Sequence, residues 1–486
     1  MRNLIPVFRR STLLIPVCTL LIMLFLASPM ARAEDEEKAV DGRIRVACVG
    51  DSITAGARAD AATESYPAQL QTLLGDDYVV RNFGRGGATL IKKGAPNVWM
   101  SIDAILAFEP HVVIISLGTN DTCGGNRRCW ENIGSFEEDY AELIDRLSAL
   151  RTGPRIFCCT PTDMILDTPD LTASRIADLE ERRPRLLELC EKTREIARQN
   201  GEKNAGIIEL NRIFQGRPEL LTPADGVHPN PDGYRVLAET LAPSVRGATM
   251  RPDGDGFIMI NSGRTLEQAD ESYADMAPVE YAPPEDRFER LPRTAQKLRE
   301  GGVLKIVMLG DSIVNDTARS GFDRLIDAAN PDLRVVKITS VRGSTGCWHY
   351  REEDRMQTYA LDFEPDLVMI GGISQRDDLD AIRECVLRIQ ESCGSDVLLM
   401  TGPFGRVDPN DAAQWEEILN CSDAYSQGLK TLADDLDVRF LDIRQAWAEY
   451  VRAEGKSVEE FKRDVVHANE QGEQILGRIL LQYFMP

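Results

Sequence analysis

Residues 44–54 read IRVACVGDSIT, an apolar run that ends in a glycine, an aspartate and a serine. An apolar run of this length that is closed by a turn residue predicts a buried strand. The aspartate and the serine then suit the start of a helix. The pattern returns at residues 304–313, which read LKIVMLGDSI. The sequence therefore predicts a strand, a sharp turn and a helix at two places in the chain.

Three further features recur in the second half in the same order. They are a pair of glycines, a proline before a strand, and an aspartate three residues before a histidine: Gly84-x-x-Gly87 and Gly343-x-x-Gly346, Pro110 and Pro365, Asp225-x-x-His228 and Asp464-x-x-His467. Four shared features in one order indicate a duplication. A chain of 486 residues is also too long for one ordinary core.

Apolar runs alternate with helical patterns in both halves, which favours the α/β fold class with parallel sheets. The expected strands cover residues 44–49, 78–82, 112–117, 155–160 and 205–210, and then 304–309, 333–338, 367–371, 397–401 and 438–442. The helices expected between them include 136–150, 174–199, 377–392 and 415–434. We therefore expect two domains, at residues 43–246 and 301–486.

Residues 247–300 lose this alternation. The breakers Pro252-Asp253-Gly254-Asp255-Gly256 and Ala282-Pro283-Pro284-Glu285 interrupt regular structure there, and a short basic helix is expected at 287–299. We expect an interdomain linker with some structure of its own.

The N-terminus has the pattern of a signal peptide. Arg2, Arg9 and Arg10 precede an apolar stretch at residues 13–28, and Ala31-Arg32-Ala33 supplies small residues for cleavage. Residues 1–33 are therefore expected to be removed, which predicts a secreted or periplasmic protein without stable membrane insertion. An uncleaved membrane anchor is the alternative, because the apolar stretch is nearly long enough to span a bilayer.

Cleavage leaves 52 basic and 78 acidic residues, a net charge of −26. A field of this sign repels nucleic acid and anionic lipid, so no nucleic-acid partner is expected. Ten cysteines remain, and their spacing forms no metal pattern. Cys123 and Cys129 flank a polar loop, and export favours a disulfide between them. The sequence leaves the oligomeric state open.

Ser52 lies where a strand turns into a helix. Such a turn presents a side chain at the carboxyl edge of a parallel sheet, where ligands of open α/β sheets bind. A serine hydroxyl becomes a nucleophile when a base removes its proton. Asp51 and Ser52 also serve well as helix caps, which is the structural alternative.

His228 is the candidate base. The chain has four histidines, and two of them follow an aspartate by three residues. This spacing lets the carboxylate of Asp225 reach the imidazole Nδ1–H, which leaves Nε2 for the serine proton. An aspartate-capped helix start would give the same spacing, and both interpretations can hold. His111 and His349 lack such a carboxylate and are expected to be structural.

Four stretches of residues 43–246 together resemble the signature blocks of the SGNH/GDSL hydrolases: Gly50-Asp51-Ser52-Ile53-Thr54, Asn82-Phe83-Gly84-Arg85-Gly86-Gly87, Gly118-Thr119-Asn120-Asp121 and Asp225-Gly226-Val227-His228-Pro229-Asn230. The resemblance implies a flavodoxin-like three-layer α/β/α fold, with Ser52 as nucleophile and His228 as base oriented by Asp225. It also implies an oxyanion hole from the N–H groups of Ser52 and Gly87 and the Asn120 side chain. Glu64-Ser65-Tyr66-Pro67 resembles the branch of bacterial carbohydrate esterases, which includes sialate O-acetylesterases and acetylxylan esterases.

The second half resembles the same pattern and departs from it at one point. Ser312, Gly346, Asp464 and His467 match their blocks, whereas Gln375 or Ser374 stands where the first half has its asparagine. Losing one oxyanion donor typically costs about 100- to 1000-fold in rate. The second half is thus a slower esterase, an esterase of other geometry, or a binding domain, and its retained Ser, Asp and His favour activity.

These observations predict an exported serine esterase that hydrolyses short acyl esters, acetyl esters above all, on carbohydrates. The expected partner is a small-molecule or polysaccharide ester, and the chemistry needs no metal or organic cofactor. The alternatives are a lipase, thioesterase or arylesterase of the same fold, or a glycan-binding protein with vestigial sites.

Overall fold

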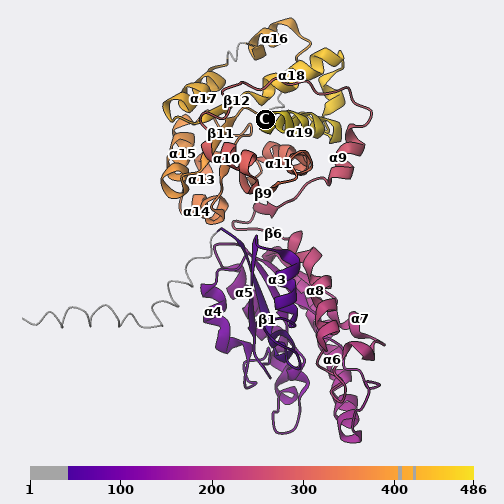
Figure 1. Cartoon of the computed structure of the whole chain (residues 1–486). Helices are drawn as coiled ribbons and strands as arrows, with labels where there is room; N and C mark the ends of the chain where they lie inside the picture. Colours follow the sequence, from indigo (N-terminus) through magenta and orange to yellow (C-terminus); the bar gives the residue numbers. More distant parts are fainter. Residues whose placement is uncertain (1–41, 403–407, 420–422, 486) are drawn as a thin grey trace, which may run out of the picture. The chain divides into compact units, whose positions relative to one another are not determined.

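The computed structural model of the protein describes residues 42–402, 408–419 and 423–485 (Figure 1). The expected signal peptide, residues 1–33, lies outside this part of the chain. Among the described helices, none combines the length and the apolar character that crossing a bilayer requires.

The first sheet is built from five parallel strands. They are β1 (Ile44–Gly50), β2 (Tyr78–Gly84), β3 (Val112–Ser116), β4 (Arg155–Cys159) and β5 (Ala205–Ile208), in the order β2-β1-β3-β4-β5. This is the strand order of the flavodoxin-like folds. The expectation of a parallel α/β sheet in the first half is therefore confirmed.

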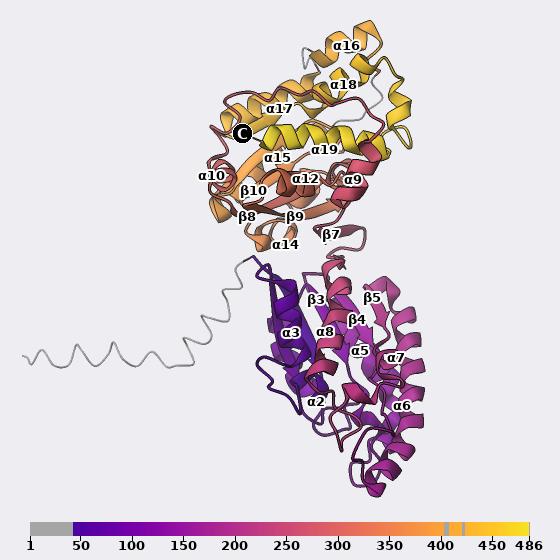
Figure 2. The ribbon, with the colours of Figure 1, turned by 45° about the vertical axis from the view of Figure 1, so that its right-hand side comes forward.

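Helices cover both faces of this sheet, which explains why every residue of β1 is buried. Helices α3 (Tyr66–Leu74) and α8 (Pro231–Arg246) lie side by side against one face (Figure 2). Helix α5 (Phe136–Ser148) packs on β4 from the other face. The remaining α-helices are α2 (Ser52–Ala55), α4 (Ile102–Ala107), α6 (Ala173–Gln199) and α7 (Leu210–Phe214).

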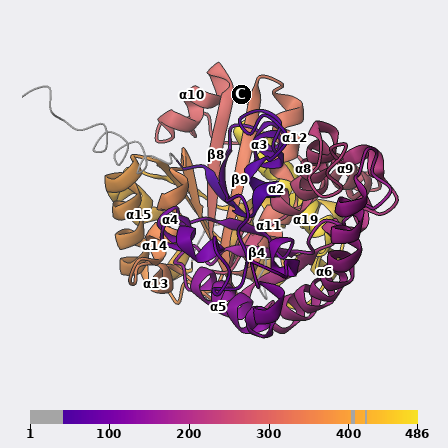
Figure 3. The ribbon, with the colours of Figure 1, turned by 90° about the horizontal axis from the view of Figure 1, so that it is seen from below.

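The second sheet has seven strands in the order β12-β11-β10-β8-β9-β7-β6. Five of them are parallel and repeat the order of the first sheet: β8 (Gly302–Gly310), β9 (Leu333–Arg342), β10 (Leu367–Ile370), β11 (Asp396–Met400) and β12 (Arg439–Leu441). Strands β8 and β9 run side by side in Figure 3.

The expectation of a wholly parallel second sheet is wrong at one edge. Strand β7 (Gly256–Ile260) pairs antiparallel with β9, and β6 (Thr249–Met250) pairs antiparallel with β7. The turn between β6 and β7 is too short for a parallel crossover, so the two strands can only form a hairpin. Both strands lie in the segment expected to be a linker, which also holds α9 (Leu266–Tyr273) and α10 (Pro292–Glu300).

The helices of the second half form two groups. Helices α12 (Phe322–Ala329), α18 (Ile443–Glu454) and α19 (Glu470–Phe484) pack together, and so do α13 (Cys347–Tyr350), α15 (Leu379–Cys393) and α17 (Ala424–Asp435). The other α-helices are α11 (Ser312–Arg319), α14 (Arg355–Tyr359) and α16 (Ala412–Leu419). The helix expected at 415–434 corresponds to parts of α16 and α17.

Each nucleophile candidate begins a helix directly after the first parallel strand of its sheet, which lies inside the sheet and not at its edge. Ser52 starts α2 behind β1, and Ser312 starts α11 behind β8. The turn after β1 requires its glycine, because a Cβ at Gly50 would lie 2.0 Å from Thr54 Oγ1 and 2.6 Å from the Ser116 carbonyl oxygen. In the first sheet β1 lies between β2 and β3, and in the second β8 lies between β9 and β10. The strand order reverses at this point in both sheets, which is where α/β sheets bind ligands.

Candidate active site

Three side chains from distant parts of the chain meet at the carboxyl end of β1. The Ser52 hydroxyl lies 2.9 Å from His228 Nε2, and His228 Nδ1 lies 2.9 Å from Asp225 Oδ1. An ionised carboxylate only accepts, so Nδ1 carries the proton and Nε2 is free to accept from Ser52. This is the hydrogen-bond chain that general-base activation of a serine requires.

The carboxylate of Asp225 is buried and strongly held. Burial raises its pKa, but hydrogen bonds from the ring and the backbone N–H of His228, together with Arg58, outweigh burial and leave the pKa well below its usual range. Oδ1 also accepts from the Val227 N–H at 3.2 Å. Arg58 Nε donates to Oδ2 at 3.1 Å. Asp225 therefore stays ionised and keeps the imidazole in one orientation.

The expected oxyanion donors lie around this turn. Within the part of the chain that the structure describes, the N–H groups of Ser52 and Gly87 have no protein acceptor. Gly87 has a φ of +77°, a left-handed conformation that favours glycine. Asn120 Nδ2 donates to the Ala88 carbonyl at 3.1 Å and to Asp51 Oδ2 at 3.4 Å, so both of its hydrogens have protein acceptors. The amide is thus held beside the residue that precedes the nucleophile.

Arg127 contacts two of the residues that carry these donors, and sequence reasoning missed it. Its Nη1 donates to Asn120 Oδ1 at 3.0 Å, and its Nη2 donates to the Gly87 carbonyl at 2.5 Å. The only signal in the sequence is its place in the polar loop between Cys123 and Cys129. The loop thus contributes a cation that touches the back of the expected oxyanion hole.

Two buried carboxyls support the same edge. Burial raises the pKa of Asp51 to about 6, although its Oδ1 accepts from the Ile53 N–H at 2.9 Å. Burial likewise raises the pKa of Asp121 to about 7, against the hydrogen bonds from the N–H groups of Ile91 and Leu90. Asp121 thereby fixes the segment that follows Gly87, and Asp51 caps the helix that Ser52 begins.

The expected disulfide between Cys123 and Cys129 is wrong, because both are free thiols in the structure. The loop places the Arg127 guanidinium 3.8 Å from Cys123 Sγ, while the Cys129 thiol donates to the Arg127 carbonyl at 3.6 Å. Both thiols therefore contact Arg127, one through its side chain and the other through its backbone. The loop is tied instead by the Trp130 N–H, which donates to the Cys123 carbonyl at 2.9 Å.

The other two histidines are bound elsewhere in the fold. His111 is buried and accepts at Nδ1 from the Arg45 N–H at 3.0 Å. His349 Nε2 lies 2.9 Å from Asp253 Oδ2, which is a carboxylate that the sequence spacing did not reveal. Among the described residues, no three His, Cys, Asp or Glu side chains are grouped so that they could hold a metal ion.

The second half brings together an equivalent set at the end of β8. The Ser312 hydroxyl lies 2.9 Å from His467 Nε2, and His467 Nδ1 lies 2.8 Å from Asp464 Oδ2. Hydrogen bonds from the N–H groups of Val466 and His467 lower the pKa of Asp464 to about 2. The Asp464 side chain is 50% exposed, compared with 6% for Asp225. The two sites share their connectivity and differ in how deeply the carboxylate is buried.

Gln375 does not take the place of Asn120, contrary to the first of the two expectations for this position. It is buried, its Nε2 donates to the Gly371 carbonyl at 2.8 Å, and its Oε1 accepts from the Cys347 N–H at 2.9 Å. The longer side chain folds under the Gly346 turn, where a Cβ on Gly346 would lie 2.5 Å from Oε1. In the first site Asp51 accepts from the Asn120 amide, whereas Asp311 accepts from the backbone N–H groups of Ile373 and Ser374, each at 2.8 Å.

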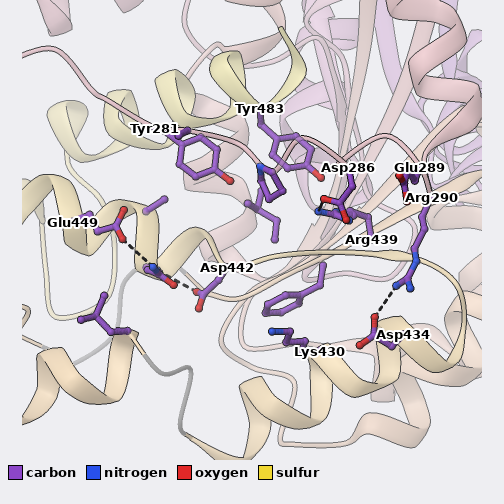
Figure 4. A pocket seen from close by; sticks show the side chains of 17 residues that line it. Tyr281, Asp286, Glu289, Arg290, Lys430, Asp434, Arg439, Asp442, Glu449 and Tyr483 are labelled. Carbon is purple, nitrogen blue, oxygen red and sulfur yellow. Dashed lines mark hydrogen bonds and ion pairs between the residues drawn. The ribbon is translucent and has the colours of Figure 1, made fainter. Parts of the chain in front are cut away.

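A cavity of about 660 Å³ in the second half contains none of these residues (Figure 4). Five acidic and three basic side chains line it, and two of its arginines pair with aspartates. Arg290 contacts Asp434 at 2.8 Å, and Arg439 contacts Asp286 at 2.8 Å. Its size alone therefore does not make it a catalytic site.

The first half has a flavodoxin-like parallel sheet, and a serine, a histidine and an aspartate are hydrogen-bonded where its strand order reverses. This combination of fold and site defines the class of α/β serine hydrolases. Residues 48–236 match the model of the GDSL-like Lipase/Acylhydrolase family. The first half of the chain is a domain of this family of carboxylic ester hydrolases, and Ser52, Gly87, Asn120, Asp225 and His228 all lie inside the match.

Individual proteins resemble the same half. An acetylxylan esterase of Xylanibacter ruminicola is 34% identical in an alignment of 224 residues that covers 42% of this chain and 43% of that protein. The crystal structure of an acetyl xylan esterase, AlAXEase, is 22% identical, covers 42% of this chain and 100% of its own, and has a TM-score of 0.33. A carbohydrate acetylesterase family member from Sinorhizobium meliloti is 21% identical, with coverages of 42% and 97% and a TM-score of 0.32. The chain thus spans less than half the length of its curated relative.

Proposed function

We propose that the first half hydrolyses short acyl esters, acetyl esters above all, on carbohydrate alcohols. The observation that carries this proposal is the 2.9 Å contact between Ser52 and His228, with Asp225 behind the imidazole. The similarity to an acetylxylan esterase over the first half supports the choice of substrate.

In the proposed reaction, His228 Nε2 takes the proton of Ser52 as Oγ attacks the ester carbonyl. The N–H groups of Ser52 and Gly87 and the amide of Asn120 stabilise the negative oxygen of the tetrahedral intermediate. His228 then gives its proton to the departing alkoxide, which leaves as an alcohol. Water attacks the acyl-enzyme by the same route and releases the acid.

The surroundings of Ser52 support a small acyl group and a polar alcohol. Glycines stand at position 87 in the oxyanion turn and at position 226 between the aspartate and the histidine. Two cationic side chains lie against the carboxylate: Arg58 is 61% exposed, and Arg175 donates to the Asp225 carbonyl at 2.8 Å. The exposed guanidinium of Arg58 offers hydrogen bonds to sugar hydroxyls beside the catalytic carboxylate.

Turnover of acyl esters by single-site variants tests the proposal. In a Ser312→Ala background, which isolates the first site, Ser52→Ala is expected to abolish hydrolysis of nitrophenyl acetate and release of acetate from acetylated xylan. Ser174→Ala, which changes an exposed serine on α6, is the matched control and should keep full activity. Activity that survives in the Ser52→Ala/Ser312→Ala protein would contradict the proposed chemistry. A preference for octanoyl over acetyl esters would instead indicate a lipase.

We also propose that the protein is exported by cleavage after Ala33. Arg2, Arg9 and Arg10, the apolar stretch and the small residues at 31 and 33 support this proposal. Cell fractionation followed by mass spectrometry of the N-terminal peptide tests this. The protein found outside the cytoplasm is expected to begin at Glu34. A full-length chain in the membrane fraction would show that the segment is an anchor.

A further inference from the structure

We propose that the second half carries an active site of its own, built on Ser312, that cleaves esters with an apolar acyl group. This site is separate from the one to which we assign the carbohydrate esterase activity, and it does not depend on that assignment. Three features of the structure lead to it: an intact relay, a supported loop, and aliphatic side chains where the first site has glycines.

The relay of the second site is complete in its contacts. Ser312, His467 and Asp464 repeat the two hydrogen bonds of the first site, at 2.9 and 2.8 Å. Asp311 caps the helix through the Ile313 N–H at 2.9 Å, as Asp51 does in the first half. The sheet order places this turn at the same reversal point, so the chain presents two serines in the same geometric setting.

The loop that carries His467 is anchored on both sides. The buried carboxylate of Asp316 accepts from Arg463 Nη2 at 2.7 Å and from the Ala468 N–H at 3.1 Å. The Arg463 N–H donates to the His467 carbonyl at 3.0 Å. These contacts hold the imidazole within reach of Ser312. A vestigial site has no physical need for such support, because the histidine itself contributes little to the core.

The oxyanion hole of this site consists of two backbone donors, the N–H groups of Ser312 and Gly346. Tyr350 on α13 donates to the Gly310 carbonyl at 2.6 Å, which ties the helix behind Gly346 to the nucleophile turn. Gln375 fixes the same turn through the Cys347 N–H and presents no amide to the substrate. One donor fewer lowers the rate by about 100- to 1000-fold.

Two exposed aliphatic side chains stand beside the relay of the second site, at positions where the first site has glycines. Val465 stands between Asp464 and His467, where the first site has Gly226, and it is 57% exposed. Ile373 follows the end of β10 by three residues and is 44% exposed. Its N–H donates to Asp311 Oδ2 at 2.8 Å, so it borders the nucleophile turn. Counted from the paired strands, its counterpart is Gly118.

The loop after Ile373 is held in a costly conformation. Arg376 and Asp377 have φ values of +56° and +54°, a region that non-glycine residues rarely occupy. The Arg376 guanidinium stacks on the Trp348 ring at 3.5 Å, and Trp348 Nε1 donates to the Ser374 carbonyl at 2.9 Å. Such local strain concentrates at functional sites, because the surrounding contacts must maintain it. The loop thus fixes Ile373 at the rim of the site.

The reaction is an acyl transfer to water. Ser312 Oγ forms a bond to the carbonyl carbon as its proton passes to His467, and the carbon–oxygen bond to the alcohol breaks as that proton moves to the leaving oxygen. A water molecule then adds to the acyl-enzyme, gives its proton to His467, and the bond to Oγ breaks with return of that proton. The products are one acid and one alcohol for each ester and water consumed.

A Ser52→Ala protein isolates the second site. We expect residual nitrophenyl acetate hydrolysis about 100- to 1000-fold below that of the unmodified protein. We also expect faster hydrolysis of nitrophenyl butanoate than of the acetate, and a fluorophosphonate adduct on the peptide that contains Ser312. The further change Ser312→Ala should remove both the activity and the adduct. Circular dichroism and the melting temperature establish that each variant is folded.

The acyl preference has its own control. Ile373→Ala and Val465→Ala, made in the Ser52→Ala protein, are expected to lower the butanoate-to-acetate ratio about fivefold or more. Leu387→Ala, at a 40% exposed leucine on α15, should leave the ratio unchanged. The absence of an adduct on Ser312 in a folded Ser52→Ala protein would overturn the second active site. An adduct with equal rates for both esters would overturn the apolar preference. Neither outcome affects the test of Ser52, which uses the Ser312→Ala background.

Discussion

The guanidinium of Arg127 donates to Asn120 Oδ1 at 3.0 Å and thereby fixes the direction in which the amide NH2 points. With Oδ1 occupied, Nδ2 faces the side of Asp51 and the nucleophile. The same guanidinium donates to the Gly87 carbonyl. The guanidinium is a cation, so its hydrogen bond to Oδ1 also polarises the Asn120 amide toward its N–H end. One side chain therefore orients the Asn120 amide and also contacts Gly87, the residue whose N–H is a second expected oxyanion donor.

Replacing Arg127 tests this role. Arg127→Met is expected to lower kcat of the first site about 10- to 100-fold with little change in KM, since a poorly oriented oxyanion donor weakens transition-state stabilisation alone. Arg127→Lys should recover part of the loss. The control is Arg128→Gln, at the exposed neighbour. Steady-state kinetics in the Ser312→Ala background measure the effect, and an unchanged kcat in Arg127→Met contradicts it.

The two relay carboxylates are expected to differ in importance. Asp225→Asn should reduce kcat/KM about 1000- to 10,000-fold, because the amide favours the wrong imidazole tautomer in a buried setting. Asp464→Asn should cost the second site less than about 100-fold, since water reaches the half-exposed carboxylate position and can accept from Nδ1. Each variant is measured with the other site inactivated. Equal losses at the two sites would show that burial does not decide the effect.

Arg58 is expected to contribute little on its own. Its side chain is 61% exposed, and exposed ion pairs are worth at most about 1 kcal/mol, or roughly fivefold in rate. Arg58→Gln should therefore lower kcat/KM on nitrophenyl acetate by less than about fivefold. A much larger loss on acetylated xylan than on the nitrophenyl ester would assign Arg58 to binding of the sugar.

Asp51 predicts a dependence of stability on pH. Its folded pKa of about 6 lies above the ordinary value of 3.8, because burial penalises the charged form. The stabilisation is therefore complete below about pH 4 and is lost as the pH rises through about 6, a change of up to about 3 kcal/mol in the free energy of unfolding. Asp51→Asn removes this titration, so the stability of the unmodified protein relative to the variant should fall by that amount as the pH rises over this range.

Denaturant unfolding at several pH values measures this difference. Asp103→Asn, at a 96% exposed side chain, is the control and should follow the unmodified protein. A difference between the unmodified protein and Asp51→Asn that stays constant from about pH 4 to 7 would mean that Asp51 does not titrate in this window.

Much of the fold was predictable because its signals are local. The apolar run of β1 and the turn after it predicted a strand buried on both faces, and the structure shows one. The spacing from Asp225 to His228 predicted their contact, since three residues in a tight loop leave few other arrangements. Such features depend on neighbours in the chain and can be derived from them.

The features that sequence reasoning missed depend on distant partners. Strand β7 pairs with β9 some 80 residues further on, and the breakers before it indicated a linker. Gln375 differs from asparagine by one methylene, and only the packing around Gly346 decides where its amide points. Arg127 stood among polar loop residues, and only the fold brings it to Asn120. The same loop decides that Cys123 and Cys129 remain thiols.

The β6–β7 hairpin matters for anyone who wishes to express the second half alone. Residues Gly256–Ile260 cover the outer side of β9 from Ile338 to Arg342. A truncated chain that begins at residue 301 would lose both strands and leave the backbone groups of β9 open to pairing between molecules, a common route to aggregation. A truncation that begins before Thr249 keeps that side closed, so the start site chosen for expression decides whether soluble material is obtained.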